Sequence, residues 1–180
     1  MSGSLFYDVA KVDQVAINLF YGWGYNFYRA ENQLRADDQL VRAQVGWLLG
    51  RARASVDSAE SAWRHKFLPP PTRAKPYPDA SAVAGAQAIE KLAHAIGALA
   101  GQIGAQPVPE QDRMTQLYRQ EAETLERLIT IDQKLVGQAE LLRSLVEQKD
   151  GAWIIANLAT LQQGLTALGE TLVQRQALLL

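Results

Sequence analysis

The chain has 180 residues, of which 48% are apolar and none is cysteine, and its formal net charge is −1 at pH 7. This length suits one domain, residues 1–180, and the apolar content is too high for an intrinsically disordered chain. The lack of cysteine excludes disulfides, thiolate zinc sites and iron–sulfur clusters, and the lack of a basic excess argues against nucleic-acid binding.

No targeting or membrane-spanning segment is expected. Charged residues interrupt any apolar run near the N-terminus, so the start of the chain does not resemble a signal peptide. The stretches 92–109 and 151–169 carry no charge, but both contain polar residues. A spanning helix needs about 20 predominantly apolar residues. We therefore expect buried helices at both places and a cytoplasmic protein.

Three breaks divide the chain into helical segments. All seven prolines lie in the connections 69–79 and 106–109, and proline interrupts a helix because it lacks the amide donor. Lys149-Asp150-Gly151 suits a tight turn between helices. Counting the N-terminal segment, residues 1–30, as the first, the fourth helix is expected to begin near Glu110. The last is expected to run unbroken from Gly151 to the C-terminus.

Apolar residues between these breaks recur every three or four positions, which is the helical period. In the fourth segment Asp132 interrupts the apolar stripe. The most regular series is Ile154, Leu158, Leu161, Leu165, Leu168 and Leu172. No segment alternates at the period of a strand. The sequence predicts an all-α fold, an antiparallel up-down four-helix bundle of long helices preceded by an N-terminal helical and aromatic segment, residues 1–30.

The N-terminal segment is unusually aromatic, with eight of the fourteen Phe, Trp and Tyr residues between positions 6 and 28. Aromatic side chains concentrate in cores and at protein interfaces. They are expected either to cap the core, to form a partner interface or to contact a membrane. The candidate partner-binding residues here are Phe20, Tyr21, Trp23, Tyr25, Phe27 and Tyr28.

The third segment carries a ridge of mostly small residues at every fourth position: Ser81, Gly85, Ile89, Ala93, Gly97, Gly101 and Ala105. Small residues let two backbones approach closely. Gly97 and Gly101 are therefore further partner-binding candidates, although the filling of a tight bundle core is the more ordinary interpretation of the ridge. The segments 80–106 and 151–180 have only two charges each, so these helices are expected to lie under other elements or to meet another chain.

Motifs for catalysis are missing. The chain has no Gly-x-Ser-x-Gly, phosphate loop or dinucleotide fingerprint. Glu90 and His94 are four residues apart and could supply two metal ligands, but a hydrogen-bonded pair is the more ordinary interpretation. We expect no enzyme activity, no metal and no cofactor.

The proline-rich connection 69–79 lies among several basic residues, namely Arg64, His65, Lys66, Arg73 and Lys75. Proline-rich segments adopt the extended polyproline conformation. This connection is therefore either a rigid strap between helices or a ligand for an aromatic groove.

These patterns favour a non-catalytic helical-bundle protein that mediates protein–protein interaction or assembly, as an adaptor or chaperone-like module that self-associates or binds a protein partner. One alternative is peripheral attachment to a membrane through the N-terminal segment, with an apolar face formed by Val9, Val12, Ala16, Leu19 and Phe20. Another is a metal- or cofactor-binding bundle that uses Glu90 and His94.

Overall fold

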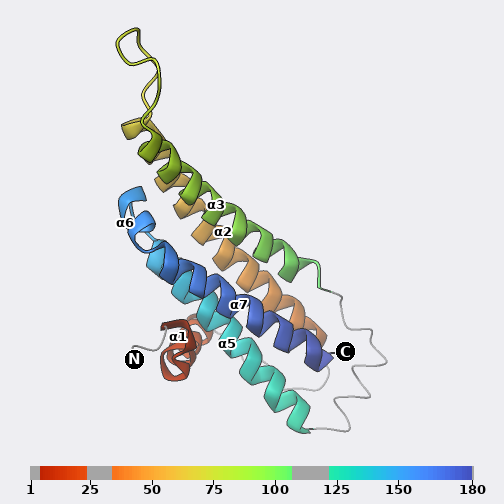
Figure 1. The fold of residues 1–180 in the computed structure, drawn as a ribbon. Coiled ribbons are helices and arrows are strands. Elements are labelled where there is room, and N and C mark those ends of the chain that lie inside the picture. Colours follow the sequence, from red (N-terminus) through yellow and green to blue (C-terminus); the bar gives the residue numbers. More distant parts are fainter. Residues whose placement is uncertain (1–4, 24–33, 107–121, 180) are drawn as a thin grey trace.

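The computed structural model describes residues 5–23, 34–106 and 122–179 (Figure 1). Within these ranges the regular elements are all helices, which confirms the predicted all-α class. In chain order they are the 3₁₀ helix η1 (Leu5–Tyr7) and the α-helices α1 (Val9–Trp23), α2 (Leu34–Phe67), α3 (Ala80–Gly104), α5 (Ala122–Val146), α6 (Gly151–Ala156) and α7 (Leu158–Leu179).

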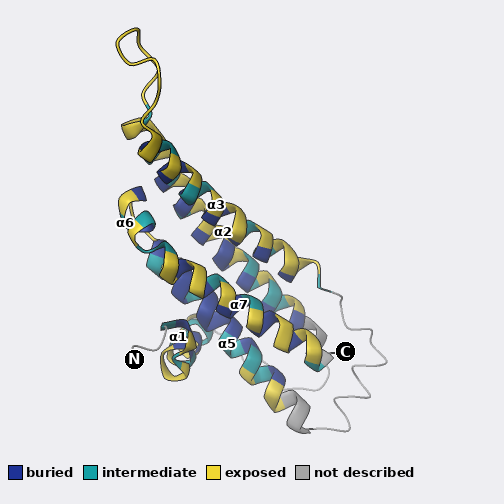
Figure 2. Cartoon of the chain, in the orientation of Figure 1, coloured by how far each residue is buried: buried dark blue, intermediate teal, exposed yellow. Residues whose placement is uncertain are grey.

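The long helices pack against one another. Helix α2 packs on α3 and α5, and α7 packs on α5 and α3. Figure 1 shows α2 and α3 running in opposite directions, as α5 and α7 do. Buried residues face the interior of this arrangement, and exposed residues face outward (Figure 2). The largest core side chains come from all of the long helices, for example Leu48, Ile96, Leu142 and Leu161, none of which is exposed.

The loop between α2 and α3, residues 68–79, projects beyond the helices (Figure 1). It begins and ends at the predicted proline-rich connection. Asp79 is the N-cap of α3 and accepts hydrogen bonds from the backbone N–H groups of Ser81 and Ala82. This cap satisfies amide donors that have no partner within the helix. The second predicted connection, 106–109, and the expected helix start near Glu110 lie almost wholly outside the described residues.

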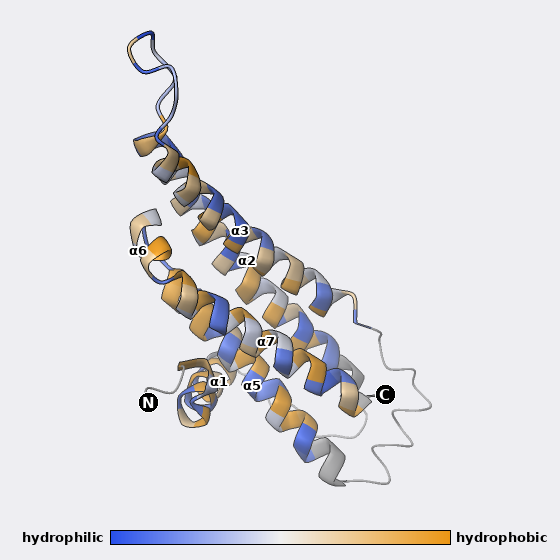
Figure 3. Ribbon diagram, viewed as in Figure 1, coloured by the Kyte–Doolittle hydropathy of each residue, from blue (hydrophilic) through white to orange (hydrophobic). Residues whose placement is uncertain are grey.

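The prediction of one unbroken last helix is wrong, because the helix is interrupted at Asn157. The Asn157 side-chain amide donates to the Trp153 carbonyl at 2.8 Å, and its backbone N–H also donates to that carbonyl. Asparagine competes in this way with regular helical hydrogen bonds. Helix α6 therefore ends at Ala156, and α7 starts at Leu158. In Figure 3 α6 is predominantly hydrophobic, whereas the α2–α3 loop is mostly hydrophilic.

The short helix α6 packs over the ends of α2 and α3. A Cβ placed on Gly151, at the start of α6, would lie 2.9 Å from Cε3 of Trp63 in α2. The Trp63 indole donates a hydrogen bond to the Ala82 carbonyl of α3 at 2.9 Å. Trp63 thus joins three helices, and only a glycine fits at position 151 beside its ring.

The N-terminal segment packs on the outside of α5 and α7. Helix α1 contacts α5, and a Cβ on Gly137 of α5 would lie 2.2 Å from the backbone oxygen of Val12. Phe6 is fully buried, with its ring against Gly164 of α7. The buried amide of Gln138 donates to the Phe6 carbonyl at 3.1 Å. Two glycines therefore provide the space in which η1 and α1 dock.

Candidate functional site

Two features outside the ordinary apolar core are the candidates for a functional role. The first is a buried group of charged side chains where α2, α5 and α7 meet the end of α3. The second is the N-terminal surface, which we define as the exposed apolar side chains Tyr7, Val9, Ile17 and Tyr21 together with Trp47 of α2.

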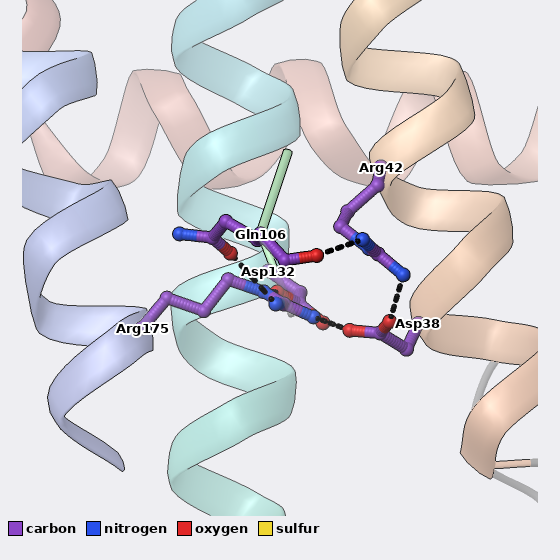
Figure 4. Close-up of polar contacts among 5 residues, drawn as sticks. All are labelled: Asp38, Arg42, Gln106, Asp132 and Arg175. Carbon is purple, nitrogen blue, oxygen red and sulfur yellow. Dashed lines mark hydrogen bonds and ion pairs between the residues drawn. The ribbon is translucent and has the colours of Figure 1, made fainter. Parts of the chain in front are cut away.

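Arg175 of α7 is at the centre of the buried charged group (Figure 4). It is only 1% exposed. Its Nε donates to Oδ1 of Asp132 in α5 at 2.6 Å, and its Nη2 donates to Oδ1 of Asp38 in α2. A buried guanidinium is costly to desolvate, and two carboxylates in direct contact offset that cost.

Two further residues belong to the group. Nη2 of Arg42 lies 2.8 Å from Oδ2 of Asp38, as an ion pair within α2. Gln106, just beyond α3, accepts from both arginines: its backbone carbonyl from Arg42 Nη1 at 2.9 Å and its side-chain oxygen from Arg175 Nη1 at 3.3 Å. The side chains thus comprise two guanidinium groups, two carboxylates and one amide, and their formal charges cancel.

The electrostatics of the group keep Arg175 charged. Burial alone would lower the pKa of its guanidinium, but the charges and hydrogen bonds of Asp132 and Asp38 outweigh burial and raise that pKa. This arrangement can hold the helices in one register. The buried charges are paired only when α2, α5 and α7 are neighbours and are aligned along their axes as observed.

Sequence reasoning did not identify this group, although two of its members have a visible signal in the sequence. Asp132 was visible as the residue that interrupts the apolar stripe of its segment. Arg175 was visible as the sole basic residue in 151–180. A charged residue on an apolar stripe signals a buried partner, since unpaired buried charges are strongly disfavoured. Asp38, Arg42 and Gln106 gave no comparable signal.

The N-terminal surface gathers large apolar side chains that remain in contact with solvent. The exposed fractions are 86% for Tyr21, 65% for Val9 and 56% for Trp47. Of the eight large hydrophobic side chains exposed in the described residues, four belong to η1 and α1. Exposed apolar residues gathered in one region commonly mark an interaction site.

An open hollow of about 410 Å³ lies beside this surface and is lined by Trp23, Ala43, Gln44 and Trp47. Trp23 also packs edge-on against Phe20, with the ring centroids 5.9 Å apart. The hollow therefore lies between the end of α1 and the outer face of α2, and two of its four lining residues are tryptophans.

The predicted aromatic residues take different positions. Tyr21 is exposed, whereas Phe20 and Trp23 are half-buried against the core. Tyr25, Phe27 and Tyr28 lie outside the described residues. Of the apolar face suggested for membrane contact, Val12 and Ala16 are buried, Leu19 and Phe20 are half-buried, and Val9 alone is exposed.

The small-residue ridge of α3 faces α2 over part of its length. A Cβ on Gly85 would lie 2.8 Å from the Trp63 ring, and a Cβ on Gly97 would lie 2.8 Å from Nη1 of Arg53. Gly101 is exposed and has open space around it. The structure thus places Gly97 at a contact within the chain and Gly101 at the surface.

The residues considered as metal ligands do not converge. Glu90 pairs with Arg64, with Oε2 and Nη2 3.0 Å apart, and His94 is exposed on α3. Over residues 5–23, 34–106 and 122–179 no three or more histidine, aspartate or glutamate side chains are grouped as they would be around a metal ion. In the same ranges, no helix has the length and apolarity required to cross a membrane.

A second hollow, of about 740 Å³, opens between the final turns of α7 and the first half of α5. Its walls mix charged and apolar residues, including Glu126, Arg127, Ile131 and Leu178.

Compared with known protein families, curated proteins and solved structures, the chain matches none. A functional role is therefore inferred from the geometry of the chain itself.

Proposed function

We propose that this chain is a non-catalytic four-helix-bundle module for protein assembly, and that it associates with a second copy of itself through the N-terminal surface. The observation that carries this proposal is the number of large exposed apolar side chains on η1 and α1, together with the hollow that Trp23 at the end of α1 and Trp47 of α2 line. Most large apolar side chains elsewhere in the described residues are in the core.

The position of α1 supports an external role for this surface. Its inner face, with Val12 and Ala16, already packs on α5, so the helix is anchored without help from its outer face. Ile17 and Tyr21 remain on the outer face at 43% and 86% exposure. Anchored aromatic and aliphatic side chains bind at a low entropic cost because their backbone is already ordered.

Charge supports a second copy as the partner. The whole chain has a formal net charge of −1, so two copies repel each other weakly. Residues 5–23 carry three charges, of which Lys11 and Asp8 form an ion pair, with Nζ 3.8 Å from Oδ2, and Asp13 is the third. A surface with little net charge suits a partner of the same kind, and a two-fold axis would pair the same patch on both copies.

Attachment to a membrane is the competing role for the same side chains. Peripheral helices usually combine an apolar face with several cations that attract anionic lipid. Lys11 is the only basic residue of α1, and it is paired with Asp8. The electrostatic part of membrane binding is therefore weak, and this favours the protein partner.

Sedimentation velocity of the full chain over a wide concentration range tests the proposal. We expect a monomer–dimer equilibrium for the wild type and a monomer for the double variant Ile17→Glu/Tyr21→Glu. The matched control is Tyr77→Ser, which removes a ring of 84% exposure from the loop between α2 and α3, away from α1 (Figure 1), and should leave the dimer intact. A wild-type chain that stays monomeric, or that floats with anionic vesicles while monomeric, would refute the proposal.

A further inference from the structure

The α2–α3 loop, residues 68–79, is a projecting structure that the proposed self-association does not use. Figure 1 shows it extending past the ends of α2 and α3, well away from α1. All its residues are exposed except Leu68, which is half-buried. The loop is thus available to another molecule even when the N-terminal surface is covered.

The loop is held in a defined conformation. The backbone N–H of Thr72 donates to the Lys75 carbonyl at 3.1 Å, and the N–H of Lys75 donates to the Thr72 carbonyl at 3.0 Å. This pair closes a tight turn over Arg73 and Ala74. Five prolines restrict the backbone on both sides of the turn, and Asp79 fixes the exit by capping α3. Less conformational entropy is therefore lost when a partner binds.

The loop and its base are positively charged. Between positions 65 and 79 the chain has three cations, Lys66, Arg73 and Lys75, and one carboxylate, Asp79. That carboxylate is engaged by Ser81, whose hydroxyl donates to it at 2.6 Å. Arg64, one turn before the loop, is already neutralised by Glu60 and Glu90. The excess charge of the tip is therefore positive and available to a partner.

The second half of the loop, Lys75-Pro76-Tyr77-Pro78, combines that positive charge with exposed proline and tyrosine rings. Tyr77 is 84% exposed, and the two prolines beside it have no backbone N–H and present rigid apolar rings. Grooves that bind proline-rich segments are lined by aromatic side chains that pack on such rings. Carboxylates at the edge of such a groove complement a neighbouring lysine or arginine.

We propose that the α2–α3 loop is a ligand for a partner protein whose groove is lined by aromatic side chains and edged by carboxylates. Pro76, Tyr77 and Pro78 enter the groove, and Lys75 and Arg73 contact its acidic edge. The molecule then has two separate binding surfaces, one for its own copy and one for this partner.

A titration of the isotope-labelled full chain with isolated SH3, WW and EVH1 domains that have acidic groove edges tests the proposal. We expect at least one of these domains to bind and to shift the NMR signals of residues 72–79 selectively. Tyr77→Ala and Lys75→Glu should each weaken that binding at least about tenfold, a change of about 1.4 kcal/mol. The control Val173→Ala, which removes an exposed apolar side chain from α7, should leave the affinity unchanged.

Three outcomes would overturn the proposal: no binding by any of the three domain classes, shifts centred outside the loop, or equal affinity of the Lys75→Glu variant. A parallel titration with anionic vesicles and with single-stranded RNA shows whether the loop acts only as a basic patch. Binding to either of these that Lys75→Glu abolishes and Tyr77→Ala leaves intact would also overturn it. Because the loop is exposed, all the variants are expected to fold as the wild type does.

Discussion

Nε of Arg175 lies 2.6 Å from Oδ1 of Asp132, although 43 residues separate the two in the chain and both are 1% exposed. The contact joins α7 to α5, and the second contact of Arg175, with Asp38, joins α7 to α2. A single side chain thus connects three long helices in a region from which water is excluded.

Replacing Arg175 with alanine should lower the free energy of unfolding by about 3–5 kcal/mol, because it removes the buried cation that contacts both Asp132 and Asp38. Chemical denaturation followed by circular dichroism measures this loss. Arg51→Ala, which removes an exposed arginine of α2, is the matched control and should change stability by less than about 0.5 kcal/mol. Equal effects of the two substitutions would show that the buried contacts contribute nothing.

Removing a charge pair should cost much less than removing one partner. The double variant Asp132→Leu/Arg175→Met takes away one negative and one positive charge and keeps the Asp38–Arg42 ion pair. Apolar side chains of similar volume often replace a buried ion pair without loss of stability. We therefore expect the double variant to recover most of the stability lost in Arg175→Ala, as measured by the same denaturation. A loss as large as that of the single variant would contradict this.

The small-residue ridge of α3 provides a comparison within one helix. Gly85→Ala should destabilise the chain by about 1–3 kcal/mol, since its Cβ would lie 2.8 Å from the Trp63 ring, which has little room to move. Gly101→Ala has open space and should instead stabilise the helix by up to about 1 kcal/mol. Thermal unfolding distinguishes the two, and a stabilising Gly85→Ala would contradict the observed packing.

Docking of α1 should depend on the absence of a side chain at position 137. In Gly137→Ala the new Cβ would approach the Val12 backbone oxygen to 2.2 Å, so α1 must move away from α5. Hydrogen exchange should then become faster over residues 9–23 while the other helices remain protected. Gly46→Ala, where nothing lies within 4 Å, is the control and should leave exchange in α1 unchanged.

The stability of the folded chain should depend on pH through Asp79, the N-cap of α3. The side-chain and backbone hydrogen bonds from Ser81, with that from Ala82 and the charge of Lys75, lower the pKa of Asp79 below its ordinary value. A lowered pKa stabilises the folded state above the unfolded pKa of about 3.9, and this contribution is lost as the pH falls through the folded pKa.

The difference in melting temperature between the wild type and Asp79→Ala should therefore be constant near neutral pH and should narrow below about pH 4. Asp79→Asn retains a capping oxygen without an ionisable proton. Its melting temperature relative to Asp79→Ala should show no such narrowing. If the difference in melting temperature between the wild type and Asp79→Ala does not change as the pH falls, the charge of the carboxylate plays no part in the cap.

Helices and breaks could be predicted because they depend on residues close together in the chain. The three-and-four spacing of apolar residues predicted the helical segments, and the prolines of 69–79 predicted the end of α2 and the start of α3. The break at Asn157 was missed, because a single asparagine inside an apolar series is usually tolerated. Its side chain ends α6 by bonding to the Trp153 carbonyl, a choice that spacing does not reveal.

The candidate sites depend on which helices become neighbours, and local spacing contains little of that information. Asp132 stood out as a charge within an apolar stripe and Arg175 as one of two charges in its segment, but the pairing of Arg175 with Asp132 and Asp38 requires α2, α5 and α7 to meet. In the same way, the exposure of Tyr21 and the partial burial of Phe20 follow from the side of α1 that rests on the bundle. Helical period is a property of one segment, whereas burial and ion pairing are properties of segments brought together by packing.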